Sequence, residues 1–124
     1  MRSDLLPLLI ATIEGGLENV AIEFDLRVAV TVILASGGYP GKYETGKPIA
    51  GLESAAQLPD VQIFHAGTKR RDGKTVTSGG RVLAITALGN SIAQARERAY
   101  AAIDQIRFEG YHFRRDIALR PAHT

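Results

Sequence analysis

Residues 35–52 (ASGGYPGKYETGKPIAGL) constrain the folding of this chain more than any other stretch. They include five glycines and two prolines in eighteen residues. Glycine loses more conformational freedom on folding than any other residue, so holding this segment in one shape is costly. The segment is therefore either a flexible linker or a loop whose backbone approaches something that a side chain would block.

An apolar helical pattern precedes this segment. Leucine and isoleucine recur at helical spacing over residues 5–13, after a predicted N-cap at Ser3, and Gly15 and Gly16 end the pattern. Such a helix needs a partner surface, and no such surface precedes it in this sequence. We interpret the helix as the tail of a truncated domain, with an apolar face that invites self-association.

The remaining patterns predict an α+β fold, strand-dominated in the middle with a helix at each end. Asp72-Gly73 predicts a hairpin turn, and Ser91 with Gln94 forms a capping box for a helix through about Ile106. Strands are predicted over residues 28–34, 61–65, 75–77 and 81–88. The predicted core consists of Val28, Val30, Val32, Ile63, Val82, Ala84, Ile85, Ile92, Ile103 and Ile106.

Composition excludes several classes of protein. The 124 residues are 45% hydrophobic, which suits one globular domain, or one domain plus a piece of another. No cysteine is present, so no disulfide framework or thiol nucleophile exists. No signal peptide or membrane span is evident, which favours the cytoplasm. Nucleic-acid binding through the basic stretches 69–74 and 107–120 is disfavoured, because the net charge is only +2.

The usual catalytic and metal-binding arrangements are missing from the sequence. His65, His112 and His123 have no metal-ligand spacing, and no nucleophile motif accompanies them. The acids Glu44, Glu53, Asp60 and Asp72 fall in predicted loops, where they are expected to be solvated. We therefore predict no catalytic residue and no metal ligand in this chain.

One stretch has the composition of an anion-binding site. Gly79 and Gly80 precede Arg81 at the mouth of a predicted strand, and Lys69 lies on the same hairpin. Bare glycines let backbone N–H groups approach an oxyanion, and an adjacent arginine can bind it through two hydrogen bonds. Arg70, Arg71 and Lys74 are interpreted as a solvated turn, whereas Arg81 is interpreted as functional.

Several of these stretches together resemble a known family. SGGYPGKYETGKPIAGL, FHAGT, TSGGRVLAITALG and QARERAY occur in this order and are followed by Phe-Glu-Gly. This series resembles the C-terminal part of the phosphoribosylamine–glycine ligases, also called glycinamide ribonucleotide synthetases, from Leu5 to about Pro121. Ser78 stands where asparagine is familiar in the family, and the run Lys69-Arg70-Arg71 is less typical.

The resemblance implies a role in de novo purine synthesis. The family belongs to the ATP-grasp enzymes, which join glycine to 5-phosphoribosylamine with ATP and Mg²⁺ or Mn²⁺. Residues 1–20 would be the tail of the ATP-grasp domain, and residues 21–124 the small β-rich C-terminal module, of the rudiment single hybrid or barrel-sandwich-like kind. ATP and metal would bind to the remaining ATP-grasp domains, so this chain alone is expected to bind neither and to be inactive.

The resemblance also assigns roles to individual residues. Arg81 would hold the 5-phosphate of phosphoribosylamine, Gly79 and Gly80 would offer backbone N–H groups, and Lys69 would add a second charge. Gly38, Tyr39 and Pro40 would form a shaped loop at the rim of the active site. The alternative is a stand-alone binding or interaction module that kept the fold and lost the chemistry.

Overall fold

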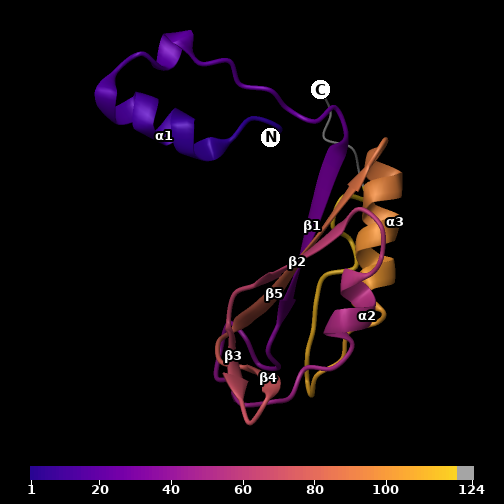
Figure 1. Ribbon diagram of the computed structural model, residues 1–124. Helices are drawn as coiled ribbons and strands as arrows, with labels where there is room; N and C mark the ends of the chain where they lie inside the picture. Colours follow the sequence, from indigo (N-terminus) through magenta and orange to yellow (C-terminus); the bar gives the residue numbers. More distant parts are fainter. Residues whose placement is uncertain (120–124) are drawn as a thin grey trace.

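A computed structural model describes residues 1–119 of the chain (Figure 1). The N-terminal part contains helix α1 (Leu5–Glu14) and a 3₁₀ turn η1 (Leu17–Asn19). The remaining helices are α2 (Leu52–Ala56) and α3 (Ile92–Ile103). The strands are β1 (Val28–Ala35), β2 (Val61–His65), β3 (Thr68–Arg71), β4 (Lys74–Thr77) and β5 (Arg81–Gly89). The predicted α+β class is confirmed.

The strands form two antiparallel sheets. One is three-stranded in the order β1-β5-β2, with Val32 and Ile63 both opposite Ile85 on the central strand. The other is the β3–β4 hairpin, in which Arg71 lies opposite Lys74 as the Asp-Gly signal predicts. The described residues form no barrel, because β1 and β2 are the two edges of an open sheet. The barrel-sandwich-like part of the prediction therefore does not hold.

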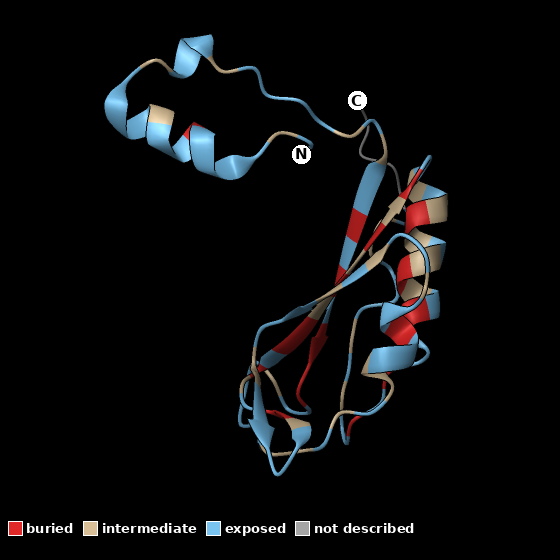
Figure 2. Ribbon diagram, viewed as in Figure 1, coloured by how far each residue is buried: buried red, intermediate tan, exposed pale blue. Residues whose placement is uncertain are grey.

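The hydrophobic core lies between α3 and one face of the three-stranded sheet (Figure 2). Side chains alternate across a strand, so every second residue of β1 and β5 faces the helix. The buried residues of this layer include Val30, Val32, Leu34, Leu83, Ile85, Ala87, Ala95, Ala99, Ala102 and Ile103. Alanines on α3 let its backbone approach the sheet closely, and α3 therefore covers β1 and β5 together.

Four residues of the predicted core are not fully buried, and two of them, Val28 and Ala84, do not belong to the core cluster. Val28 is 36% exposed, because it lies opposite Gly89 at the end of the sheet, where the partner offers no side chain. Ala84 is half-buried and lies opposite Ile33 and Phe64, on the sheet face away from α3. Ile63 and Ile92 are half-buried and pack against the core, and the other predicted members are buried.

The helix ends differ from the predictions for local reasons. Asp4, not Ser3, caps α1, because the Ser3 hydroxyl bonds to Ala21 O and Glu23 N instead. Ser91 caps α3 as predicted, with its Oγ accepting from Gln94 N at 3.2 Å. That helix ends at Ile103 rather than Ile106, because the backbone then turns to pair Arg107 with Ala50.

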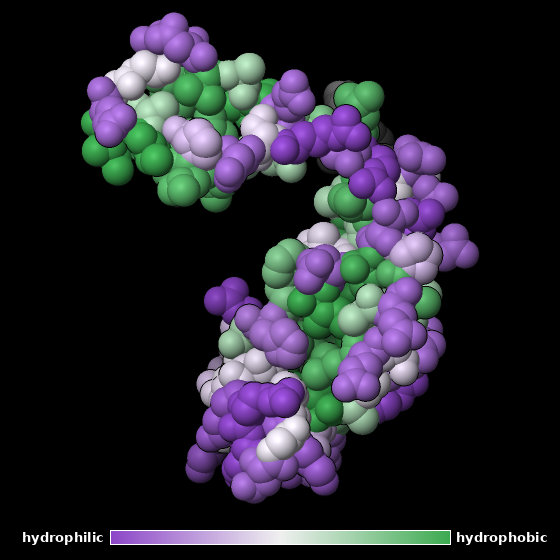
Figure 3. Space-filling model, in the orientation of Figure 1, coloured by the Kyte–Doolittle hydropathy of each residue, from purple (hydrophilic) through white to green (hydrophobic). Residues whose placement is uncertain are grey.

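The N-terminal segment stands apart from the domain and exposes apolar side chains (Figure 3). The backbone N–H groups of Arg2 and Ser3 both donate to Glu23 O, so residues 1–23 fold back on themselves. The exposed large hydrophobic residues of this segment are Met1, Leu5, Leu6, Leu9, Ile10, Ile13, Leu17, Ile22, Phe24 and Leu26. The exposed apolar face of α1 that the sequence predicts is therefore present. No helix of residues 1–119 is long and apolar enough to span a bilayer.

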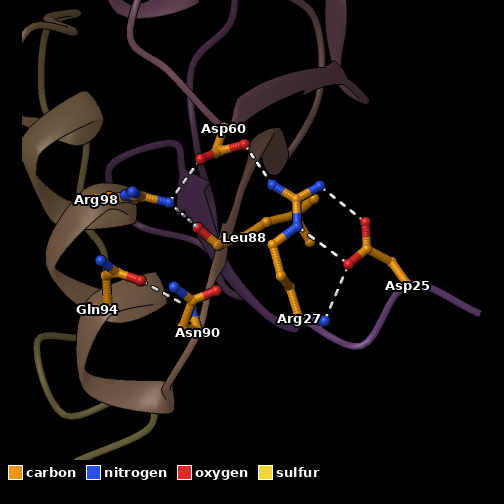
Figure 4. Close-up of polar contacts among 7 residues, drawn as sticks. All are labelled: Asp25, Arg27, Asp60, Leu88, Asn90, Gln94 and Arg98. Atoms are coloured by element: carbon orange, nitrogen blue, oxygen red, sulfur yellow. Dashed lines mark hydrogen bonds and ion pairs between the residues drawn. The ribbon is translucent and has the colours of Figure 1, made fainter.

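A network of charged side chains joins this segment to the domain (Figure 4). The Arg27 guanidinium donates to both carboxylate oxygens of Asp25, at 3.0 and 2.8 Å, and to Asp60 Oδ1 at 2.6 Å. Arg98 on α3 donates to Asp60 Oδ2 and to Leu88 O, both at 2.7 Å. Asp60 thus connects the segment before β1, residues 20–27 (the linker), to α3. It is not the solvated acid that the sequence predicts.

Hydrogen bonds from Arg27 hold the pKa of Asp25 well below its ordinary value of 3.8. A carboxyl group whose pKa is lower in the folded state stabilises that state above its ordinary pKa, and the contribution is lost as the pH falls below it. The junction is therefore expected to be intact at neutral pH and to loosen only in acid.

We predict that Asp60→Asn frees the linker from the domain. Asp60 has φ +59°, and asparagine tolerates this left-handed backbone well, so the substitution removes charge without adding strain. Amide hydrogen exchange over residues 20–27 should accelerate, while exchange in β5 stays unchanged. Glu53→Gln removes an exposed charge elsewhere and is the control. Unchanged exchange at the linker would show that the network does not anchor it.

Candidate phosphate-binding site

The turn between β4 and β5 is shaped by close contacts between backbone segments. Ser78 N–H donates to Gly67 O at 2.7 Å, and Gly67 N–H donates to Arg81 O at 2.8 Å. A Cβ atom added to Gly67 would lie 2.8 Å from the Gly79 Cα atom, nearer than real Cβ contacts come. Glycine is required here because two stretches of backbone cross without room for side chains.

The start of the glycine-rich segment holds this turn in place. Ser36, only 3% exposed, donates its N–H to Gly80 O and its hydroxyl to Gly79 O, both at 2.8 Å. A Cβ atom added to Gly80 would overlap the ring of Tyr39. The loop and the turn that the sequence singles out separately therefore meet, although 43 residues separate Ser36 from Gly79.

The loop itself is a tight, shaped structure. Tyr39 N–H donates to Ser36 O at 3.1 Å, and the Tyr39–Pro40 peptide bond is cis. Gly38 has φ +93°, and a Cβ atom there would overlap Lys42 O. Of the two interpretations of residues 35–52, the structure supports the loop whose backbone approaches other backbone, not the flexible linker.

Arg81 and the two glycines leave hydrogen-bond donors free. Within residues 1–119, the Arg81 guanidinium has no hydrogen bond or ion pair, and the N–H groups of Gly79 and Gly80 have no acceptor. A purely structural Arg81 would pair with Asp72 or Glu109, but Glu109 is bonded to Lys47 instead. Arg81 is exposed and directly follows Gly79, which is half-buried, and Gly80, which is buried. Backbone N–H groups without acceptors followed by an arginine have the composition that an oxyanion site needs.

Lys69, predicted as a second phosphate ligand, lies on β3 opposite Val76. It lines a hollow of about 1150 Å³ whose lining does not include Arg81, Gly79 or Gly80. Of the predicted rim residues Gly38, Tyr39 and Pro40, Tyr39 has its ring against Gly80. The structure thus brings Tyr39 to the turn before Arg81, and the roles of all seven residues stay predictions.

Sequence reasoning missed a charged cluster beside the loop. Lys47 Nζ lies 2.8 Å from Glu109 and 2.9 Å from Glu44, at a hollow of about 450 Å³ that Gly37 also lines. These carboxylates raise the pKa of Lys47, Glu109 more than Glu44, and Lys47 lowers the pKa of Glu44. The pairing of Lys47 with Glu109 could not be predicted from local sequence, because 62 positions separate the two residues.

Within residues 1–119, His65 and His112 belong to no cluster of metal-ligating side chains. His65 Nδ1 lies 3.0 Å from Thr68 Oγ1, and His112 joins β1 through backbone bonds with Ala35. Within residues 1–119, no group of three or more metal-ligating side chains comes together. His123 and Arg120 lie outside the described residues.

Comparison with known proteins decides the family. Residues 29–120 match the family described as "Phosphoribosylglycinamide synthetase, C domain". This chain belongs to that family. The match begins just inside β1 and includes both the Ser36–Pro40 loop and the turn before Arg81, so the site lies within the conserved family domain of the chain.

Related proteins show how much of a longer chain this sequence represents. It is 46% identical to the phosphoribosylamine–glycine ligase of Rhodopirellula baltica over 119 residues, which are 95% of this chain and 27% of that protein. It is 49% identical to the ligase of Caldanaerobacter subterraneus subsp. tengcongensis, covering 95% of this chain and 28% of that protein. This chain thus spans about a quarter of the length of these relatives.

A solved structure gives the same assignment. The crystal structure of the phosphoribosylamine–glycine ligase of Thermotoga maritima superposes with a TM-score of 0.68 at 38% identity. The superposition covers 88% of this chain and 27% of that one. The fold of the synthetase C domain is therefore shared with a ligase of known structure.

We predict that Gly80→Ala destabilises the domain. The new methyl group meets the Tyr39 ring, and overpacking of this kind costs about 1–3 kcal/mol. Urea denaturation measures the loss. The double variant with Tyr39→Ala should recover part of it, because the obstructing ring is gone. Full stability of Gly80→Ala alone would contradict the packing described here.

Proposed function

We propose that this chain is the C-terminal part of a ligase that joins glycine to 5-phosphoribosylamine with ATP, in de novo purine synthesis. Membership of the synthetase C-domain family and the printed names of its relatives support this proposal. The protein would act in the cytoplasm. The chain contributes contacts to the substrate and is inactive alone, because it amounts to about a quarter of those ligases.

Within that ligase, Arg81 binds the 5-phosphate of phosphoribosylamine. The observation that carries this assignment is the free guanidinium beside the free N–H groups of Gly79 and Gly80. Charge-assisted hydrogen bonds to a phosphate are about twice as strong as neutral ones, and the planar arginine fork also fixes orientation. The phosphate anchor positions the amine of phosphoribosylamine for reaction, while the Ser36–Tyr39 clamp holds the donors in place.

ATP and a divalent cation belong to the rest of the ligase. ATP supplies the phosphoryl group that activates glycine, and Mg²⁺ or Mn²⁺ neutralises phosphate charge. Residues 1–119 contain no cluster of metal-ligating side chains, so they do not fit a metal site.

The remaining ATP-grasp domains are the natural partner of the exposed apolar surfaces. Besides α1, the sheet face away from α3 leaves Ile33 and Phe64 exposed at 41% and 53%. Large exposed apolar patches mark interaction surfaces. In the isolated chain the same surfaces would favour self-association.

We predict that Arg81→Ala, made in the complete ligase, raises the KM for phosphoribosylamine about ten- to hundredfold, because a charge-assisted contact is lost. The KM values for ATP and glycine should change little. Arg81→Lys should restore only part of the effect, since an ammonium group lacks the planar fork. Steady-state kinetics with each substrate varied in turn measures the three constants.

The control is Arg71→Ala, an exposed arginine of the β3–β4 hairpin. It removes the same charge and should leave all three KM values unchanged. An Arg81→Ala enzyme that unfolds at lower temperature with unchanged KM values would make Arg81 structural. Ligase activity of the 124-residue chain alone would contradict the proposed division of labour.

A further inference from the structure

A hollow larger than the one beside Lys47 does not have Arg81 in its lining. It has a volume of about 1150 Å³ and is lined by residues of α2, the edge strand β2 and the β3–β4 hairpin. Sites for small ligands are of this size. Nothing in the proposed role of Arg81 uses it, since Arg81 is not among its lining residues.

Strand pairing determines which side chains of the hairpin face the hollow. Residues directly opposite each other in an antiparallel pair point to the same side, and neighbours along a strand point to opposite sides. Arg70 lies opposite Thr75, so these two share a face with Thr68. Ile49, whose N–H donates to Thr75 O at 2.9 Å, extends this face, and all four residues line the hollow.

The next arginine provides a contrast. Arg71 lies opposite Lys74 on the other face of the hairpin, with its guanidinium near Gly46, and it does not line the hollow. Two adjacent arginines of one strand therefore have different surroundings, and of the two only Arg70 lines the hollow. Lys69 and Lys74 belong to the Arg71 face of the hairpin but line the hollow at its edge.

The polar groups of the hollow suit an anion. Lys69, Arg70 and Lys74 line it against a single acid, Glu53. None of these four residues takes part in an ion pair within residues 1–119, whereas Arg27, Lys47, Arg98 and Arg114 do. His65 Nδ1 and Thr68 Oγ1 are 3.0 Å apart, so a ring and a hydroxyl are held in position beside Arg70.

The opposite wall of the hollow is apolar. It consists of half-buried side chains that pack against the core but remain reachable, namely Leu52, Val61 and Ile63. A ligand that uses both walls needs a charged group at one end and a flat or apolar body at the other.

We propose that this hollow binds a phosphate ester with a ring body, of the nucleoside monophosphate class. Arg70 grips the phosphate through its planar fork, with the hydroxyls of Thr68 and Thr75 as further donors. Lys69 and Lys74 add positive charge at the edge, and the ring lies on Leu52 and Ile63. The site is distinct from the Arg81 turn and does not depend on it.

The test is a titration of the 124-residue chain with AMP, followed by isothermal calorimetry and by amide chemical shifts. Shifts should concentrate in residues 48–56, 61–65 and 68–75. Adenosine, which lacks the phosphate, should bind at least about tenfold more weakly, and raising the salt concentration should weaken AMP binding. Arg70→Ala should raise the Kd for AMP about three- to tenfold, and Arg70→Lys should raise it less.

Arg71→Ala is the matched control, with the same residue and the same charge change one position away. It should leave the Kd for AMP unchanged. Three results would each overturn the proposal: no shifts in the hollow at millimolar AMP, equal affinity for adenosine and AMP, or equal weakening by Arg70→Ala and Arg71→Ala. Circular dichroism of both variants ensures that loss of binding is not loss of folding.

Discussion

The site depends on one contact, in which Ser36 and Tyr39 hold the turn Gly79-Gly80. Two hydrogen bonds from Ser36 use up the carbonyl groups of both glycines, and the Tyr39 ring covers Gly80. The N–H groups of both glycines have no acceptor within residues 1–119, and Gly80 itself is buried beneath the Tyr39 ring. The entropy cost of the glycine-rich loop is thus offset by packing that fixes the turn before β5.

Charge pairing differs between the cations of the chain. Arg27, Arg98 and Lys47 each bond to carboxylates within the described residues. Arg70, Arg71 and Arg81 do not, so the lack of a carboxylate partner does not by itself mark a ligand-binding arginine. Arg81 differs from Arg71 in following two glycines, and Arg70 differs from it in lining the larger hollow. These are the two arginines for which we propose an anionic ligand.

Much of the fold could be predicted from sequence, because it rests on local patterns. Alternation in residues 28–34 and 81–88, the Asp72-Gly73 turn and the Ser91 cap all depend on neighbours a few residues away. Other features depend on distant contacts, and the sequence does not reveal them. The loss of Val28 from the core follows from Gly89 opposite, the ion pair of Lys47 needs Glu109, and Ser36 gains its role only where it meets Gly79. Lys69 lies on the predicted hairpin, yet strand pairing sets it apart from Arg81.

The central claim is that the N–H groups of Gly79 and Gly80 and the Arg81 guanidinium form one oxyanion site. The most direct measurement is the amide NMR spectrum of the chain during titration with ribose 5-phosphate. New hydrogen bonds to phosphate should move the Gly79 and Gly80 amide proton signals downfield together, and Arg81→Ala should abolish both shifts. If the two signals stay in place while the ligand binds elsewhere, or if they move equally in Arg81→Ala, the account of the site is contradicted.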